Sequence, residues 1–271
     1  MNILIIGDIY AQAGRTAVKK YLPQLIKKYN INLIIANGEN TTHGKSIAKH
    51  HYNELKEAGI NIITSGNHIF RNPEVLKYIE EVNDLLKPAN MNSFTPGQGT
   101  VVINVNNKKV RITNLMGRSF MDPVDNPYTI FEEIIANDDS DYHFVDFHAE
   151  ASAEKLAFAW NYDGIITGFF GTHTHVQTAD NRILPKGTGY ITDVGMCGSY
   201  DSIIGANPDE IIIKEKTGLP VRFEPATEND RLIFSAALLQ VDDKTNKAIK
   251  IDRILIRPEN ETNFLHNKGE Y

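Results

Sequence analysis

Two histidines two positions apart are the most informative feature of this sequence. They lie in Gly171-Thr172-His173-Thr174-His175, which directly follows the apolar stretch 165–170. If this segment is a turn at the end of a strand, both imidazoles can converge on one point or on two adjacent points. Imidazoles are common ligands of transition metals, so the pair predicts a metal site.

Four other apolar, β-like runs end in the same manner, in a residue that can bind a metal or transfer a proton. The runs 2–6, 33–36, 60–63 and 142–147 lead into Asp8, into Glu39 and Asn40, into Asn67 and His68, and into His148. Ligands and chemistry gather at the carboxyl ends of strands in α/β sheets. The five runs therefore predict one shared site.

The side chains at these strand ends form a donor set of carboxylates, carboxamides and imidazoles without a thiolate. Such a set suits Fe, Mn, Zn or Co. It exceeds what one ion needs, but two ions about 3.5 Å apart with a bridging carboxylate would use it fully. Two divalent ions would leave the pocket positive and attract phosphate, and a hydroxide held between them could attack phosphorus in line.

In the first half of the chain, the predicted strands that carry these residues alternate with predicted helices. Helical spacing of apolar residues predicts helices over 15–29, 45–58 and 73–82, with Asn72 as the N-cap of the third. Strand and helix in alternation predict parallel βαβ units with right-handed crossovers.

The rest of the chain is richer in hairpins. The runs 100–105 and 109–115 flank a turn, and 221–224, 231–241 and 248–256 are β-rich, with 242–246 as a turn. We expect these late strands to form a second, more antiparallel sheet packed on the first. The fold class is thus α/β, with two packed mixed β-sheets flanked by helices. We expect one domain over 1–271, with a polar tail at 258–271.

Composition fits a soluble enzyme. The net charge of −6 over 271 residues gives no broad footprint for long nucleic acid. The lone cysteine, Cys197, excludes internal disulfides and fits a small residue in a crowded loop. No segment approaches the ~20 apolar residues of a membrane span, and the first residues lack a signal peptide's basic region. These features predict a cytoplasmic protein.

The ordered motifs resemble a known family. Gly-Asp, Gly-Glu-Asn, Gly-Asn-His, a lone His and Gly-Thr-His-Thr-His, in this order, are similar to the calcineurin-like metallophosphoesterases, and most similar to their YmdB-like branch. The resemblance runs through nearly the whole chain. It implies a four-layer α/β/β/α sandwich and a dinuclear phosphodiesterase that acts on 2′,3′-cyclic nucleotides.

The resemblance also implies a role for each motif residue. One metal would be held by Asp8, Glu39, Asn40 and His175, and the other by Glu39, Asn67, His148 and His173, with Glu39 bridging. His68 would give a proton to the leaving oxygen. The chain departs from the broader superfamily at Tyr10, where a histidine ligand is usual, and Asn40 would supply the missing donor. The metals would be iron, with Mn²⁺ or Zn²⁺ as alternatives.

Several of these residues have a second interpretation. Asn40 could cap the next segment, His148 could be a core histidine, and His68 could orient a ligand instead of donating a proton. His43 and Arg118 lie near the motifs and are candidate substrate contacts. Asp193 follows the histidine pair and is expected to anchor its loop or order the ligands.

Two other functions remain open beside the phosphodiesterase. The same machinery could serve a phosphomonoesterase, such as a nucleotidase or protein phosphatase, although few basic residues lie near the motifs to hold a dianion. The chain could also be a metal-stabilised regulatory protein with little turnover. An amidohydrolase barrel is disfavoured because its His-x-His pair comes early in the chain. The expected partners are a small phosphodiester and a second copy of the chain, without membrane or long nucleic acid.

Overall fold

The computed structural model describes residues 1–226 and 230–261 of the chain. The helices are α1 (Ala11–Tyr29), α2 (Lys49–Glu57), α3 (Pro127–Ile135), α4 (Ser152–Asn161) and α5 (Pro208–Thr217), with 3₁₀ helices η1 (Ile69–Arg71), η2 (Pro73–Lys77) and η3 (Ile79–Glu81). The strands are β1 (Asn2–Ile6), β2 (Asp8–Ile9), β3 (Leu33–Asn37), β4 (Ile62–Thr64), β5 (Thr100–Val105), β6 (Lys108–Met116), β7 (Tyr142–His148), β8 (Gly168–Thr172), β9 (Arg182–Ile183), β10 (Gly189–Ile191), β11 (Met196–Ser199), β12 (Leu232–Asp242) and β13 (Lys247–Ile256). Residues 262–271 of the expected polar tail lie outside the described residues.

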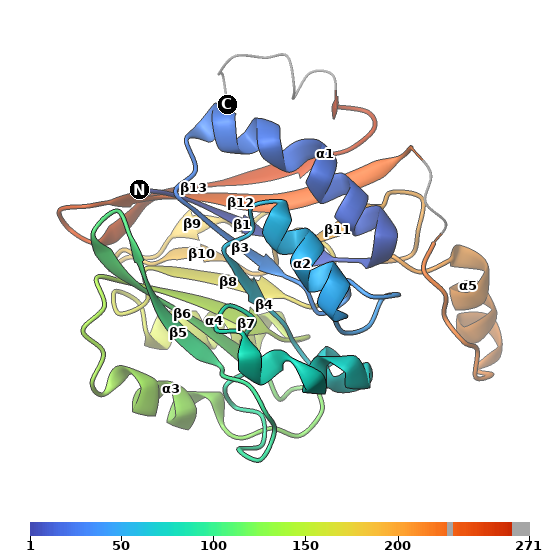
Figure 1. The fold of residues 1–271 in the computed structure, drawn as a ribbon, viewed down its shortest axis with the longest axis horizontal. Coiled ribbons are helices and arrows are strands. Elements are labelled where there is room, and N and C mark those ends of the chain that lie inside the picture. The colour runs from blue at the N-terminus through green and yellow to red at the C-terminus, as the bar shows by residue number, and fades with distance from the viewer. Residues whose placement is uncertain (227–229, 262–271) are drawn as a thin grey trace.

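These strands form two mixed sheets that pack face to face (Figure 1). The first sheet has the order β2-β11-β12-β1-β3-β4, and β13 pairs with β12 beside it. The second sheet has the order β5-β6-β7-β8-β10-β9. Helices α1 and α2 cover the first sheet, and α3 and α4 cover the second, so the chain forms the expected α/β/β/α layers.

Alternation along the strands explains this layering. In β1, Ile3 and Ile5 point into the core between the sheets, whereas Leu4 and Ile6 pack against the helix layer. A strand that is apolar on both faces must be covered on both, as in α/β proteins. In β7, Phe144 enters the same inter-sheet core, and Phe147 packs on the other side against Phe158 of α4.

The predicted parallel βαβ start is confirmed, because β1, β3 and β4 pair in parallel. The predicted helix over 73–82 is wrong in type. Asn72 does cap this segment by accepting a hydrogen bond from the main-chain N–H of Glu74, but two 3₁₀ helices, η2 and η3, follow instead of an α-helix. Apolar residues spaced three to four apart suit both helix types, so the pattern could not separate them.

Of the late strands expected in the second sheet, β5 and β6 do lie there, but for the last two strands the expectation is wrong. β12 lies inside the first sheet, antiparallel to β1, and β13 pairs with β12 as the predicted hairpin. The run Leu232–Val241 is buried on both faces for most of its length, which suits an interior strand. The segment 221–224 forms no strand.

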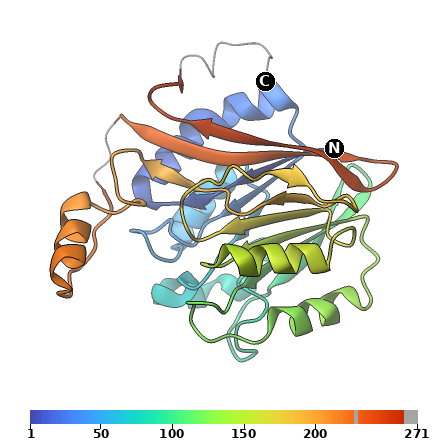
Figure 2. The same cartoon turned by 180° about the vertical axis from the view of Figure 1, so that it is seen from behind.

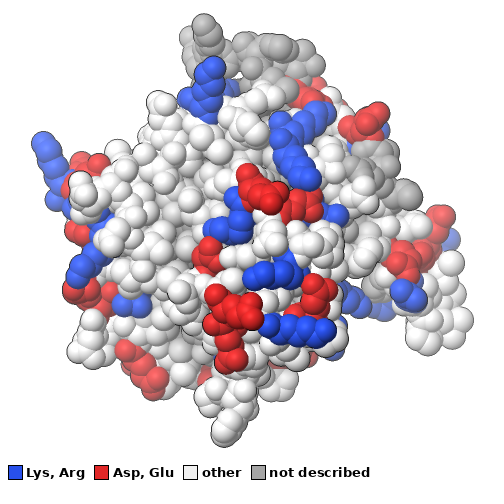
Figure 3. All heavy atoms as spheres, viewed as in Figure 1, with Lys and Arg blue, Asp and Glu red and all other residues white. Residues whose placement is uncertain are grey.

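Helix α5 projects from the body of the molecule in both views (Figures 1 and 2). None of its residues is buried. On the face seen in Figure 3, basic and acidic side chains are interspersed. Among the described residues, no helix is both long and apolar enough to cross a membrane.

Candidate metal centre

The carboxyl ends of strands from both sheets meet at one edge of the molecule. In the second sheet, His148 at the end of β7 is in register with Met116 of β6 and Thr172 of β8. Glu39 follows β3 of the first sheet, and its Oε1 lies 3.1 Å from His148 Nε2. The loops after these strands therefore bring residues from distant parts of the sequence into one cluster.

Three side chains converge on a single nitrogen of this cluster. His173 Nδ1 and Asn67 Oδ1 each lie 3.1 Å from His148 Nε2, as Glu39 Oε1 does. One ring nitrogen carries at most one proton and cannot bond to all three. A side chain at Gly66 would come within 2.3 Å of the same nitrogen, which explains the glycine before Asn67. Atoms crowded in this way suit a cation at their centre.

The charges of Glu39, His148 and His173 shift one another's pKa values. Burial opposes charge on both Glu39 and His148, but their mutual attraction lowers the pKa of the Glu39 carboxyl and raises that of His148. Burial, aided by the charge of His148, lowers the pKa of His173 to about 3 and keeps this ring neutral. An ionised carboxylate and a neutral imidazole are the forms that bind metals, so Glu39 and His173 are in ligand form, and His148 would release a proton on binding one.

A second group of residues lies beside the first. Asp8 and Asn40 are buried, and His175 Nε2 lies 3.7 Å from Asp8 Oδ1. Burial raises the pKa of Asp8 to about 6, although His175 opposes this shift. Asp8 Oδ1 and Asn40 Oδ1 accept no hydrogen bond from the described residues. An unsatisfied buried acceptor costs about 1–3 kcal/mol, and a cation beside these two oxygens would remove that cost. The residues present therefore fit a metal.

Contacts to the other ring nitrogens determine which nitrogen of each histidine faces the cluster. His148 Nδ1 lies 2.9 Å from Thr172 Oγ1, which leaves Nε2 for the cluster. His175 Nδ1 lies 2.8 Å from the main-chain oxygen of Ile204, which leaves Nε2 for Asp8. His173 Nε2 lies 3.2 Å from Glu150 Oε2, so its Nδ1 is the inward atom. Contacts of this kind fix the tautomer of a ligand histidine.

Asp146 joins the two sheets beneath the cluster. Its carboxylate accepts hydrogen bonds from Asn37 of β3, Thr64 of β4 and Thr172 of β8. Because Thr172 also contacts His148 Nδ1, a chain of hydrogen bonds runs from Asp146 to the imidazole. Burial raises the pKa of Asp146 to about 7, although the charge of His148 and the hydrogen bonds from Thr64 and Thr172 oppose this shift.

A buried ion pair holds the loop that carries His173 and His175. Lys155 of α4 and Asp193 are both fully buried, and Lys155 Nζ lies 2.9 Å from Asp193 Oδ2. The ammonium also donates to the main-chain oxygen of Thr172 at 2.9 Å. Asp193 accepts hydrogen bonds from the main-chain N–H groups of Thr174 and Gly195. The loop is therefore fixed on both sides of His173.

Unusual backbone conformations concentrate around this edge. Among the described residues, eleven non-glycine residues have positive φ, and four of them are asparagines, which tolerate it. The other seven follow the carboxyl ends of strands, six of them in loops and Ala11 at the first position of α1: Ala11, His43, Ser46, Phe120, His173, His175 and Ile204. Such strain persists where the surrounding structure enforces it, and it is common at functional sites.

The three remaining candidates lie around this cluster. His68 has 29 % of its side chain exposed, and its Nδ1 lies 3.4 Å from Asn40 Nδ2 and 3.7 Å from Glu39 Oε1. His43 is exposed in the loop after β3. Arg118 is exposed after β6 and lines a cavity of about 380 Å³ with Tyr128 and Glu154. In the described part of the chain, neither His43 nor Arg118 forms a hydrogen bond or ion pair with a predicted ligand.

Several contributors to the site were not predicted from the sequence, among them Glu150, Lys155 and Ile204. Glu150 could have been found, because it lies two residues after His148. Lys155 gave no signal, because a lysine in a helix is usually solvated. The main-chain oxygen of Ile204 could not be found from side-chain chemistry at all.

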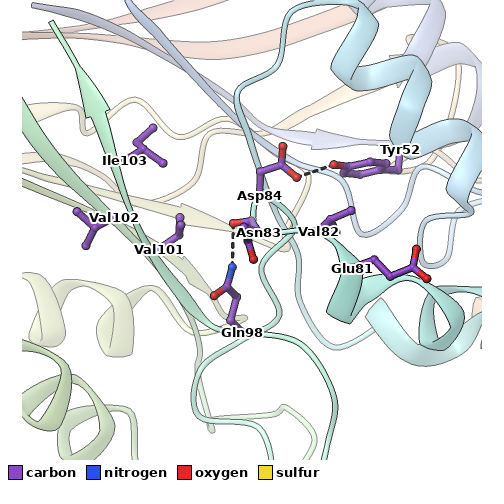
Figure 4. A pocket seen from close by; sticks show the side chains of 9 residues that line it. All are labelled: Tyr52, Glu81, Val82, Asn83, Asp84, Gln98, Val101, Val102 and Ile103. Atoms are coloured by element: carbon purple, nitrogen blue, oxygen red, sulfur yellow. Dashed lines mark hydrogen bonds between the residues drawn. The ribbon is translucent and has the colours of Figure 1, made fainter.

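A larger cavity, of about 760 Å³, lies beside β5, at one edge of the second sheet (Figure 4). Tyr52 of α2 and Asp84 form one side, and Val101, Val102 and Ile103 of β5 form the other. Tyr52 donates a hydrogen bond to Asp84, and Gln98 donates one to the main chain of Asn83. None of the predicted site residues lines this cavity.

Comparisons with known proteins agree with this architecture. A protein of Bacillus subtilis (strain 168) named 2′,3′-cyclic-nucleotide 2′-phosphodiesterase is 47 % identical over 261 residues, which cover 96 % of this chain and 98 % of that protein. A crystal structure described as a novel phosphatase from Mycoplasma pneumoniae superposes with a TM-score of 0.90 at 44 % identity, covering 95 % of this chain and 93 % of that one.

A crystal structure of a hypothetical protein from Thermus thermophilus superposes similarly, with a TM-score of 0.89 at 37 % identity. The superposition covers 95 % of this chain and 99 % of that one. The family model described as YmdB-like protein matches residues 4–254, which is nearly the whole chain. The chain therefore belongs to the family of YmdB-like proteins.

Proposed function

We propose that this chain is a metal-dependent phosphodiesterase that opens small cyclic nucleotides of the 2′,3′ type. The name of the B. subtilis relative supports the substrate class. The observation that carries the metal requirement is the pair of buried, unsatisfied oxygens on Asp8 and Asn40 beside a crowded group of imidazoles. Both features are explained by cations that belong in the site.

Seven side chains would hold two metal ions. Asp8, Asn40 and His175 would bind the first ion, and Asn67, His148 and His173 the second, with Glu39 between them. When bound, such ions offset charge on a phosphoryl group and make water nucleophilic at neutral pH. Oxygen and imidazole donors suit iron, Mn²⁺ or Zn²⁺.

We assign to His68 the proton that the reaction needs. Opening the ring adds water across one P–O bond, so that a hydroxyl joins phosphorus and a proton must reach the departing ribose oxygen. Asn40 and Glu39 flank Nδ1 of His68, so Nε2 is the nitrogen left for the substrate. A positioned proton donor typically contributes about 10²–10⁴-fold to the rate.

The leaving group provides the test of this assignment. We expect His68→Ala to retain both metals and lose most turnover of a 2′,3′-cyclic nucleotide, but lose much less on a nitrophenyl diester, whose leaving group departs without a proton. His50→Ala, at an exposed histidine of α2, is the matched control and should behave as wild type. An equal loss on both substrates would reject the proton-donor role.

The substrate class is tested on the same sample. Initial rates on 2′,3′-cyclic, 3′,5′-cyclic and monoester nucleotides are compared by kcat/KM, with metal content measured in parallel. Uniformly tighter binding of a dianionic monoester does not speed the chemical step, so the cyclic diester should be preferred. Faster hydrolysis of nucleoside monophosphates than of every diester would reject this proposal in favour of a nucleotidase.

A further inference from the structure

The segment after β6, residues 117–122, forms a loop along one side of the candidate metal centre, and we call it the rim loop. At its start, the main-chain N–H of Gly117 donates to the oxygen of His148 at 3.0 Å. At its end, Asp122 lies 3.6 Å from Arg71, which is three residues after His68. The rim loop therefore runs from a predicted metal ligand to the neighbourhood of the proposed proton donor.

The main chain of the first half of the rim loop is fixed by hydrogen bonds to α4. Glu154 of α4 accepts hydrogen bonds from the main-chain N–H groups of Arg118 (2.8 Å) and Ser119 (3.2 Å). A side chain at Gly117 would come within 2.5 Å of both Ala149 and Glu154. Because these contacts fix the backbone, the side chain that follows is presented in a defined place.

That side chain is Phe120. Its exposure and its backbone conformation are both unfavourable for a residue whose only role is to stabilise the fold. Phe120 is 92 % exposed, so its ring buries almost no area in the protein. Its φ of 62° places a bulky residue in the left-handed region, which side chains of this size rarely adopt. An exposed aromatic ring on a strained but anchored backbone is typical of a binding residue.

We propose that Phe120 stacks against the nucleobase of the bound substrate. This inference rests on the proposed function, because the leaving oxygen of a 2′,3′-cyclic nucleotide belongs to the nucleoside itself. The nucleoside must then lie on the side of the proton donor, which is the side that the rim loop borders. Aromatic rings bind bases of any sequence through their faces, so the contact favours nucleotides over diesters without a base.

The test compares two cyclic substrates that differ only in the base: adenosine 2′,3′-cyclic phosphate and methyl riboside 2′,3′-cyclic phosphate. Metal-loaded wild-type protein should prefer the adenosine compound by kcat/KM. In Phe120→Ala this preference should fall by about 5- to 150-fold, the range for loss of one base–aromatic stack. Phe120→Trp should restore it, because a larger ring stacks at least as well.

Phe94→Ala is the matched control. Phe94 is 95 % exposed but does not share the left-handed backbone, and it lies outside the rim loop. This variant should keep the wild-type preference. An unchanged preference in Phe120→Ala would overturn the proposal, as would an equal fall in both alanine variants.

Calorimetry with adenosine 3′-monophosphate separates this proposal from the proposed function. If the wild type hydrolyses neither diester, the proposed function fails, and binding of the monophosphate then decides the role of Phe120. Weaker binding to Phe120→Ala than to Phe94→Ala supports base stacking. Equal binding to the two variants overturns it.

Discussion

Replacing Lys155 by methionine tests whether the buried ion pair positions the metal ligands. Methionine has nearly the length of lysine but no charge, so the packing of α4 is largely retained. The change leaves the fully buried Asp193 without its cation and removes the hydrogen bond to the main-chain oxygen of Thr172. We expect a loss of stability and a separate loss of metal affinity.

The size of each loss follows from the contacts. Removing one partner of a buried pair typically costs about 3–5 kcal/mol. Asp193 keeps the N–H groups of Thr174 and Gly195, which favours the lower end, about 3 kcal/mol. For a chain of this size that corresponds to a fall in Tm of about 6–12 °C. Loosened support of ligands usually lowers metal affinity by about 10–100-fold.

The assay measures the two losses separately. Calorimetric unfolding of the metal-free protein gives the change in stability, and titration of the folded protein with Mn²⁺ below its Tm gives the affinity. Arg111→Met is the control, because Arg111 forms a largely buried pair with Asp138 near the amino end of β6, away from the ligands. It should lose stability while binding Mn²⁺ as the wild type does.

A double variant, Lys155→Met with Asp193→Leu, sharpens the comparison. Removing both charges of a buried pair is often nearly neutral for stability, so Tm should recover in part. Affinity should stay low, because the N–H of Thr174 has lost its acceptor. If Lys155→Met loses stability but binds Mn²⁺ as tightly as wild type, the pair does not position the histidines and the reasoning is refuted.

Three further outcomes are expected. Glu39→Ala should lower the occupancy of both metals together and Asn67→Ala chiefly that of one, as measured by elemental analysis after loading; about one metal per wild-type chain would contradict this. Ile204→Asn should relieve a left-handed backbone and raise Tm by about 2–4 °C without loosening His175, whose partner is the main-chain oxygen. Burial, aided by the charge of Arg15, lowers the pKa of His51 to about 4 in the folded protein. Between pH 6.5 and 4 the unfolded chain therefore binds more protons than the folded one. The stability conferred by the neutral ring is lost as pH falls through this window. Urea midpoints of wild type and His51→Asn should therefore converge on acidification, and a constant difference would show that the ring does not titrate there.

Local patterns predicted the strands and the pairing of strands close in sequence, but not the pairing of strands far apart in the chain. The runs before Asp8, Glu39 and His148 are strands, because a continuous apolar run bounded by polar turn residues has few other solutions. α1 begins four residues before the predicted start at Arg15, because the sequence carries no N-cap signal there. The place of β12 beside β1 depends on contacts between residues far apart in sequence, which periodicity does not record.

In the site, too, some residues could be predicted from local sequence and others could not. Every residue proposed as a ligand lies at a strand end or within three residues after it, where a rule about strand ends can find it. The groups that orient these ligands obey no such rule. Lys155 enters from a helix that the sequence analysis did not predict, and Ile204 contributes only its main chain.

The pairing of β1 with β12 also constrains how the chain is made. β1 pairs with β3 on one side and with β12 on the other, and Met1 bonds to Val241, which lies 240 positions later. At about 5–20 residues per second, a ribosome needs roughly 12–50 s to add that length. Throughout this interval one edge of β1 has no partner in its own chain, and unpaired apolar edges associate readily with other chains. Because Asp8 follows β1, the strand that leads to this predicted ligand gains the support of β12 only after translation has passed β12.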